Sequence, residues 1–250
     1  MEGNPRSVVV SEIFDQLAGM LEHLGEKRIA ILHLGGFELR FDVVTVIMSW
    51  IVVALLVILA LFLRRALRQD IEEKPNRVQA ALDMLIDLLR GQLTSNFASE
   101  RMAIALFPFI ATLFLYVLLS NWLGVVPYMM SPTQDLNVTL GLALMVFFVS
   151  QVLAARAKGV RGYLKGYIEP VPFLLPLNII GEISKPMSHA FRLFGNILAG
   201  TILVTVVMAK IAPVIIPPVL YGVFGLFFGA IQAFVFAILA VAYINVAVES

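Results

Sequence analysis

The chain has 250 residues, of which 60% are hydrophobic and only 14% are charged, and its mean hydropathy is +0.93. Soluble domains carry roughly 25% charged residues, so this sequence has too little polar surface for a water-soluble globule and predicts an integral membrane protein. The formal net charge of +1 excludes the basic face of a nucleic-acid-binding protein. The absence of cysteine excludes disulfides, thiolate catalysis and iron–sulfur clusters.

A polar arm precedes the first hydrophobic segment. Charged side chains recur through residues 1–42, whereas residues 43–63 contain none and reach the roughly 20 apolar residues that a membrane-spanning helix needs. Arginines follow this span at once. In residues 69–101, charged residues recur among leucines, a pattern that predicts an amphipathic helix lying at the membrane interface.

Two further charge-free runs, residues 102–120 and 138–155, form a predicted hairpin of membrane spans. The loop between them contains neither lysine nor arginine, whereas residues 156–165 are basic. Because lysine and arginine favour the cytoplasmic side, we expect the basic segment and the arginines after residue 63 in the cytoplasm. The N-terminal arm is then expected outside, and the C-terminus is expected in the cytoplasm.

The last two hydrophobic segments, residues 168–210 and 219–247, are too long for upright spans. A helix over residues 220–247 would be about 42 Å long, whereas the hydrocarbon core is about 30 Å thick. Both segments are therefore predicted to be strongly tilted or bent. The predicted fold is an all-α integral membrane protein with about five transmembrane helices and one interfacial amphipathic helix, in a single membrane domain over residues 43–250.

Polar residues gather on one face of the first of these two long helices. At about 100° per residue, the polar side chains between positions 178 and 196 fall within about 120° of its circumference. They are Asn178, Glu182, Lys185, Ser188, His189, Arg192 and Asn196. A charged side chain at mid-bilayer costs roughly 2.5–3.5 kcal/mol, so such residues face protein or water and commonly mark ion pathways.

Arg192 is the central charge of this polar stripe. Arginine stays protonated, so it can pair with a carboxylate or block a cation, but it cannot carry the proton itself. Glu182 lies too far along the helix to be a close partner, and Asp135 belongs to the outer loop. The partner carboxylate is therefore expected from another chain. An arginine satisfied by backbone carbonyls inside a helix bundle is the structural alternative.

Structural roles are also open for the other members of the stripe. A lone interior histidine such as His189 is more often a hydrogen-bonded core residue than a proton relay. Lys185 can extend its ammonium to the interface, Glu182 can simply be solvated there, and Asn196 can bond a neighbouring helix.

The last helix contributes Gln232, whose amide can both donate and accept a hydrogen bond. Tyr243 and Gly225 share its face of the helix. A contact between this amide and Arg192 or a passing carboxylate is one interpretation, and a purely structural role is the other. For Gly225 and Gly229, four residues apart, we favour close helix packing.

Four sequence motifs, in the same order along the chain, resemble those of one known family. The run SKPMSHAFRLFGNILAG at residues 184–200 closely resembles the signature of the a subunit of F-type ATP synthases, in its bacterial and chloroplast form. The stretches NWLGVVP (121–127), DLNVTL (135–140) and QAFVF (232–236) agree in order and spacing. The resemblance covers about residues 40–247.

This resemblance implies a proton-conducting stator beside a rotating ring of c subunits, each of which bears a membrane carboxylate. Two aqueous half-channels would reach the ring from opposite sides, with Arg192 as the essential charge barrier between them and with Asn196 and Gln232 shaping the contact. The implied partners are the c-ring, b-type peripheral stalk subunits, the rest of the ATP synthase and lipid of the cell inner (plasma) membrane. No cofactor or metal is expected. Since the sequence has no Gly-rich phosphate loop, the chain is not expected to be an enzyme on its own.

Two positions depart from the family pattern. Bacterial members often carry an acid where this sequence has Thr201, and often a polar or charged group where it has Gly225. Other groups are then expected to line the outer half-channel. The candidates for this lining are Asn178, Glu182, His189 and Asp135, and Ser188 and Tyr243 complete the predicted proton pathway.

Two functions from other classes stay open. A stand-alone secondary transporter or cation antiporter would use Arg192, Glu182 and His189 at a broken helix, although that architecture usually shows two related halves. A structural scaffold would tolerate the loss of Arg192.

A comparison of two energies refines the ATP synthase interpretation. An arginine–carboxylate pair about 4 Å apart is worth about 4 kcal/mol at an effective dielectric of about 20. A proton that crosses about 100 mV releases only about 2.3 kcal/mol. A dry, tight pair would therefore trap the ring, and we expect Arg192 to meet the ring carboxylate in a hydrated, loose contact.

Overall fold

The computed structural model of the chain describes residues 29–34, 37–66, 77–97, 99–126, 129–168, 172–210 and 221–249. Five of its helices are long and apolar enough to cross a membrane, and a further amphipathic helix accompanies them. The predicted fold class, a multi-pass helical membrane protein with one additional helix, is therefore confirmed.

A short sheet precedes the membrane helices, and the sequence analysis did not predict it. Strands β1 (Ile29–Leu34) and β2 (Phe37–Asp42) pair antiparallel, with Leu34 opposite Phe37. Apolar and charged residues alternate along β2, and this period of two is typical of a strand. The rest of the predicted polar arm, residues 1–28 and 35–36, lies outside the described residues.

The first long helix, α2 (Val43–Ala66), begins where the strand ends because Asp42 caps it. The Asp42 carboxylate accepts hydrogen bonds from the Val44 N–H (3.2 Å) and from the Thr45 hydroxyl (2.8 Å), which satisfies donors that every helix start leaves free. The arginines predicted to follow the span form its last turn.

Helix α3 (Arg77–Asn96) lies within the predicted interfacial segment 69–101. It is amphipathic as expected, because Leu89 and Leu93 are buried against α4 whereas Asp83, Asp87 and Arg90 are exposed. Residues 69–76 lie outside the described residues. The position of α3 at a membrane interface stays a prediction.

Helices α4 (Glu100–Leu123) and α5 (Leu136–Ile168) form the hairpin, joined through the short 3-10 helix η1 (Pro132–Gln134). Both exceed the predicted spans 102–120 and 138–155. Helix α5 changes direction at Gly159, whose φ of 73° lies in the left-handed region that favours glycine. The basic segment 156–165 therefore lies on both sides of this kink.

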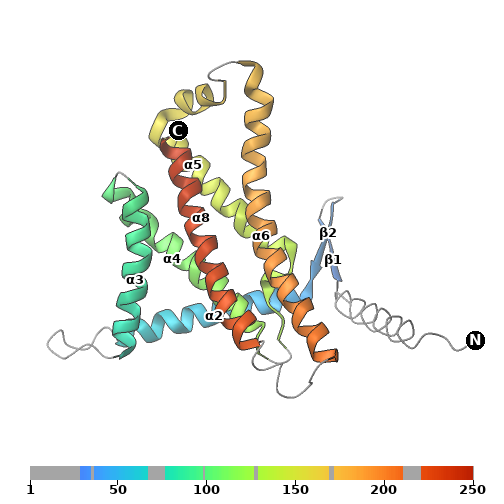
Figure 1. Cartoon of the computed structure of the whole chain (residues 1–250). Coiled ribbons are helices and arrows are strands. Elements are labelled where there is room, and N and C mark those ends of the chain that lie inside the picture. The colour runs from blue at the N-terminus through green and yellow to red at the C-terminus, as the bar shows by residue number, and fades with distance from the viewer. Residues whose placement is uncertain are drawn as a thin grey trace, which may run out of the picture.

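The last third comprises α6 (Leu175–Lys210), preceded by η2 (Pro172–Leu174), and then the π-helix η3 (Tyr221–Phe228), which runs directly into α8 (Gly229–Glu249). With 36 residues, α6 is about 54 Å long and exceeds the bilayer core of about 30 Å. In Figure 1, α2 runs across the view and α6 runs up it, so the two cannot both stand upright in one membrane. The tilt of the last two helices relative to a bilayer stays a prediction.

Helix α8 lies at the centre of the bundle, in contact with α3, α4, α5 and α6 (Figure 1). Ala233, Ala237 and Ala240 are completely buried on it, and such small residues let neighbouring helices approach closely. Phe236 and Ile244 fill the spaces between them. The core thus holds α6 and α8 beside each other, with the polar residues of α6 near their contact.

Candidate functional site

The polar stripe of residues 178–196 lies on α6, and the structure divides it by exposure. The half-buried members are Asn178, Glu182 and Lys185, and the exposed members are Ser188, Arg192 and Asn196. His189 is buried, with 1% of its surface exposed. Because the stripe covers about 120° of the helix, its edge at His189 turns towards α8 while its centre faces away from the core.

Arg192 has no intramolecular partner within the part of the chain that the structure describes: it forms neither an ion pair nor a hydrogen bond there. Its side chain is exposed. Glu182, the nearest acid along α6, is paired with Lys185 instead. An exposed, unpartnered arginine agrees with a carboxylate supplied by another chain, which stays a prediction.

A cavity of about 560 Å³ opens beside Arg192 between α6, η3, α8 and the loop that follows α4. We call it the loop-side cavity. Its polar lining consists of Asn121, Ser131, Gln134, Asn196, Thr201 and Gln232. Among the described residues that line it, Arg192 carries the one charge.

The structure joins Asn196 to Gln232, a pair that the sequence analysis did not predict: it offered a contact of Gln232 with Arg192 or a passing carboxylate, and a bond from Asn196 to a neighbouring helix. The Asn196 Nδ2 donates a hydrogen bond to the Gln232 Oε1 across a distance of 2.5 Å. Gln232 is 5% exposed, and its Nε2 has no hydrogen-bond partner among the residues that the structure describes. One helical turn after Arg192, this pair therefore links α6 to α8 on the wall of the loop-side cavity.

Thr201 and Gly225, the two positions that depart from the family pattern, both line the loop-side cavity. The Gln134 Nε2 donates a hydrogen bond of 2.9 Å to the Thr201 hydroxyl, so a neutral pair occupies this part of the wall. A Cβ atom on Gly225 would come within 2.2 Å of the Val125 Cγ2. There is no room for a side chain there, which confirms close packing as the role of this glycine.

Buried hydrogen bonds fix the loop that carries Gln134. The Ser131 hydroxyl donates to the Ser120 carbonyl (2.7 Å), and the Thr133 hydroxyl donates to the Asn121 Oδ1 (2.7 Å). The Asn121 Nδ2 donates in turn to the Gly229 carbonyl at 2.9 Å. The NWLGVVP motif thus ties the loop to the start of α8.

Asp135 lies at the start of α5, where its Oδ1 accepts a hydrogen bond of 2.8 Å from the Asn137 N–H. It is 6% exposed and is not part of the lining of the loop-side cavity. The structure therefore gives Asp135 a helix-capping contact, and its predicted role in the proton pathway stays a prediction.

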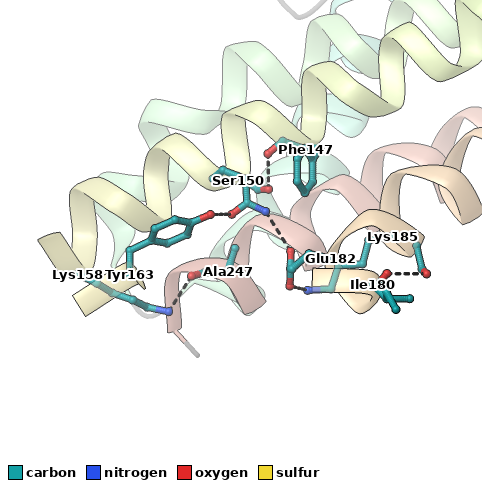
Figure 2. Close-up of polar contacts among 10 residues, drawn as sticks. Phe147, Ser150, Lys158, Tyr163, Ile180, Glu182, Lys185 and Ala247 are labelled. Atoms are coloured by element: carbon teal, nitrogen blue, oxygen red, sulfur yellow. Dashed lines mark hydrogen bonds and ion pairs between the residues drawn. The ribbon is translucent and has the colours of Figure 1, made fainter. Parts of the chain in front are cut away.

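A second polar cluster lies on the other side of Arg192 along α6 (Figure 2). The Glu182 carboxylate accepts one hydrogen bond from the Gln151 Nε2 at 3.0 Å and pairs with Lys185. The Tyr163 hydroxyl donates to the Gln151 Oε1 at 2.7 Å. A chain of polar groups thus runs from the basic part of α5 to Glu182.

A narrow pocket of about 10 Å³ adjoins this cluster and shares Glu182 and Lys185 with it. We call it the His189 pocket. Its polar lining consists of Ser150, Glu182, Lys185, His189 and Tyr243. The His189 ring packs on Phe236 and Tyr243, with centroids 3.8 Å and 5.4 Å apart. Asn178 and Ser188 line neither the pocket nor the cavity.

Sequence reasoning missed Gln134, Gln151 and Tyr163. Gln151 is a strongly polar residue inside a predicted span, and the criterion that singled out Gln232 would have found it as well. The other two lie in segments assigned to loops, where polar residues carry no signal. Within the described residues, no group of three or more histidine, aspartate or glutamate side chains could hold a metal ion.

Comparison with known proteins gives consistent matches. The family model described as ATP synthase A chain matches residues 46–245. A relative in Crocosphaera subtropica, ATP synthase subunit a 1, is 40% identical over 200 residues, which cover 80% of this chain and 84% of the relative. ATP synthase subunit a 2 of Acaryochloris marina is 40% identical over 203 residues, with 81% and 84% covered. ATP synthase subunit a of Desulforamulus reducens is 36% identical over 207 residues, with 80% and 78% covered.

Proposed function

Because this chain belongs to the family of ATP synthase A chains, we propose that it is the proton-conducting stator of its complex. Its membership makes it a multi-pass membrane subunit of an ATP synthase and not a stand-alone enzyme. In the proposed mechanism, protons reach and leave the carboxylates of a ring of c subunits through two half-channels in this chain, and b-type subunits hold it against rotation.

The observation that carries this proposal is the state of Arg192. An arginine stays charged inside a membrane and has a large cost unless it faces water or a counter-charge. Here it is exposed and unpartnered within the described residues, with the loop-side cavity beside it. A ring carboxylate would supply the counter-charge, and the cavity would supply the water that keeps this contact loose enough for rotation.

The two polar regions on either side of Arg192 support two half-channels. The loop-side cavity reaches the loop between α4 and α5, which the positive-inside bias assigns to the outside. The Glu182 cluster reaches the basic part of α5, which the same bias assigns to the cytoplasm. We therefore propose that Glu182 and His189 belong to the cytoplasmic half-channel and not, as expected from the sequence, to the outer one. In this arrangement the C-terminus is cytoplasmic and the complex lies in the cell inner (plasma) membrane. Since Arg192 stands between the regions, a proton would cross only by travelling on the ring.

ATP-driven acidification of inverted membrane vesicles tests this function. We expect Arg192→Ala to abolish acidification while the complex still assembles and hydrolyses ATP, because the barrier and the counter-charge are both lost. Arg101→Ala is the matched control, since Arg101 is an exposed arginine at the start of α4, away from the site. Normal acidification by Arg192→Ala would contradict the proposal. Ion transport by the isolated chain, without a c-ring, would instead support a stand-alone transporter.

A further inference from the structure

Among the described residues, the buried side chain of His189 has no hydrogen-bond partner. It is 1% exposed, and neither Nδ1 nor Nε2 makes a hydrogen bond. A neutral imidazole has one donor and one acceptor, and a buried polar group left unsatisfied costs about 1–3 kcal/mol. The sequence analysis included His189 in the predicted proton pathway, but the mechanism proposed above gives it no step of its own.

His189 lies between an aromatic side chain of α8 and a pocket with a polar lining. Towards α8 the ring lies against Phe236, at a centroid distance of 3.8 Å. The His189 pocket adjoins it, with Ser150, Glu182, Lys185 and Tyr243 in its lining. Its volume of about 10 Å³ is at the lower limit for one buried water, which needs two to four polar partners. The pocket therefore has both the size and the lining of a single-water site.

The Glu182 cluster holds the polar wall of this pocket in place. Gln151 and Lys185 bind the two carboxylate oxygens of Glu182, and Tyr163 binds the Gln151 amide from the opposite side (Figure 2). Tyr163 belongs to the part of α5 beyond the Gly159 kink. Hydrogen-bonded groups thus extend from this part of α5 to the edge of the His189 pocket.

We propose that one water bound in the His189 pocket joins His189 to Glu182, and that His189 is the innermost proton-relaying group on the basic side of Arg192. The proposal rests on the proposed function and deepens it. His189 precedes Arg192 by one helical turn, so the relay Glu182–water–His189 ends beside the barrier, and Gln151 and Tyr163 serve only to hold Glu182 in place. The carboxylate, the water and the imidazole can each accept one proton and pass another on, so that none of the three is consumed.

The absence of cysteine from the sequence provides a direct test of water access. In intact complexes in membrane vesicles, a single thiol is introduced as His189→Cys or, as the matched control, Leu193→Cys. Leu193 is 0% exposed, lies one turn away on α6 and is not part of the pocket. The vesicles are first treated with Ag⁺, an ion small enough for a single-water site, and the chain is then denatured, alkylated with iodoacetamide and analysed by mass spectrometry, so that a thiol reached by Ag⁺ is protected from alkylation. Thiols react in hydrated surroundings and are inert in apolar ones, so we expect protection at position 189 and little at 193.

A functional comparison separates a relay from a packing role. Passive proton flow through the complex is measured for His189→Gln, which can still hold a water, and for His189→Leu, which cannot. Because neither glutamine nor leucine can bind and release a proton, we expect flow to fall about tenfold or more in both variants, whereas a packing role predicts normal flow in the leucine variant, which fills the same space. Flow in either variant equal to that of the unaltered complex, or equal protection at positions 189 and 193, would overturn the proposal.

These outcomes are distinguishable from a failure of the proposed function. If Arg192→Ala abolishes ATP-driven acidification but the His189 variants conduct normally, the stator function stands and the water relay is wrong. If Arg192→Ala acidifies vesicles normally, the proposed function itself is wrong.

Discussion

The two sides of Arg192 differ in both size and chemistry. The loop-side cavity measures about 560 Å³, and within the described residues Arg192 is the one charge in its lining. The His189 pocket measures about 10 Å³ and is lined by a carboxylate, an ammonium and an imidazole. Under the proposed function, the wide side would pass protons through water held by neutral amides and hydroxyls. The narrow side would depend on side chains that bind protons themselves.

This difference accounts for the two departures from the family pattern. Thr201 and Gly225 both belong to the wide side, where a neutral pair and a closely packed glycine stand in place of ionisable groups. Water can fill a cavity of this size, so a path there does not require an acid at position 201. In the His189 pocket, by contrast, Glu182 pairs with Lys185, and the His189 ring packs on Phe236 and Tyr243.

After the loss of Arg192 itself, the largest expected effect comes from the contact between α6 and α8 beside it. Gln232→Leu leaves the Asn196 amide without its partner, at a cost of about 1–3 kcal/mol. If this cost falls on the transport step, ATP-driven acidification by the assembled complex falls about 10- to 100-fold. Vesicle acidification, normalised to ATP hydrolysis, measures the loss.

A double-variant comparison sharpens this prediction. Because Asn196 and Gln232 share one hydrogen bond, Asn196→Ala combined with Gln232→Leu should be little worse than either alone. If the fold-reduction in acidification of the double variant equalled the product of the two single reductions, the two residues would not act as a pair.

The next effect concerns the packing of the cavity wall. Gly225→Ala forces a methyl group against Val125, and overpacking of this kind typically costs about 1–3 kcal/mol. We expect less assembled complex and a lower melting temperature in detergent. The companion change Val125→Ala removes the obstructing atom and should restore both. A Gly225→Ala complex as stable as the unaltered one would contradict the close approach.

A smaller effect is expected on the narrow side. Tyr163→Phe removes the donor to Gln151 and loosens the wall that positions Glu182. A neutral hydrogen bond contributes about 0.5–1.5 kcal/mol, so proton flow should fall a few-fold, by about 2- to 10-fold. Tyr116→Phe on α4 is the matched control, because Tyr116 is also half-buried and lines neither region. Equal flow in the two variants would remove Tyr163 from the path.

The smallest effect is on stability alone. The Lys158 ammonium donates a hydrogen bond of 2.9 Å to the Ala247 carbonyl in the last turn of α8, where a positive charge is worth about 0.3–1 kcal/mol. Lys158→Ala should lower the melting temperature slightly and leave acidification per assembled complex unchanged. A strong loss of acidification would give this lysine a part in transport.

Much of this organisation follows from the sequence because the membrane simplifies the physics. Long apolar runs with few or no charges are typical of membrane spans, so the five membrane helices were predictable, and the charges recurring among leucines predicted the amphipathic α3. The 100° turn per residue placed Arg192, Asn196 and His189 on one face of α6. Gln232 stood out as a strongly polar residue in the last span, and the family motifs agreed with it.

Other features depend on contacts that no local pattern reveals. The partition of the stripe, with His189 buried and Arg192 exposed, depends on where α8 packs against α6. The Gln134–Thr201 and Gln151–Glu182 contacts join residues 67 and 31 positions apart. The close approach of Gly225 to Val125 joins two residues 100 positions apart, and a sequence motif around Gly225 gives no information about that contact. Apolar and charged residues alternate along β2, which is a strand pattern. The sequence analysis considered only the frequency of charges in this region and therefore predicted a polar arm.

The central claim is that Arg192 separates the two regions, and the decay of an imposed proton gradient tests it most directly. Vesicles carrying the complete complex without nucleotide are compared for the unaltered chain, Arg192→Ala and the charge-conserving Arg192→Lys. We predict rapid decay in Arg192→Ala, because the loop-side cavity and the narrow side would then connect, and slower decay when lysine keeps the positive charge. The account would be contradicted if an assembled Arg192→Ala complex still acidified vesicles and its proton gradient decayed as slowly as that of the unaltered complex.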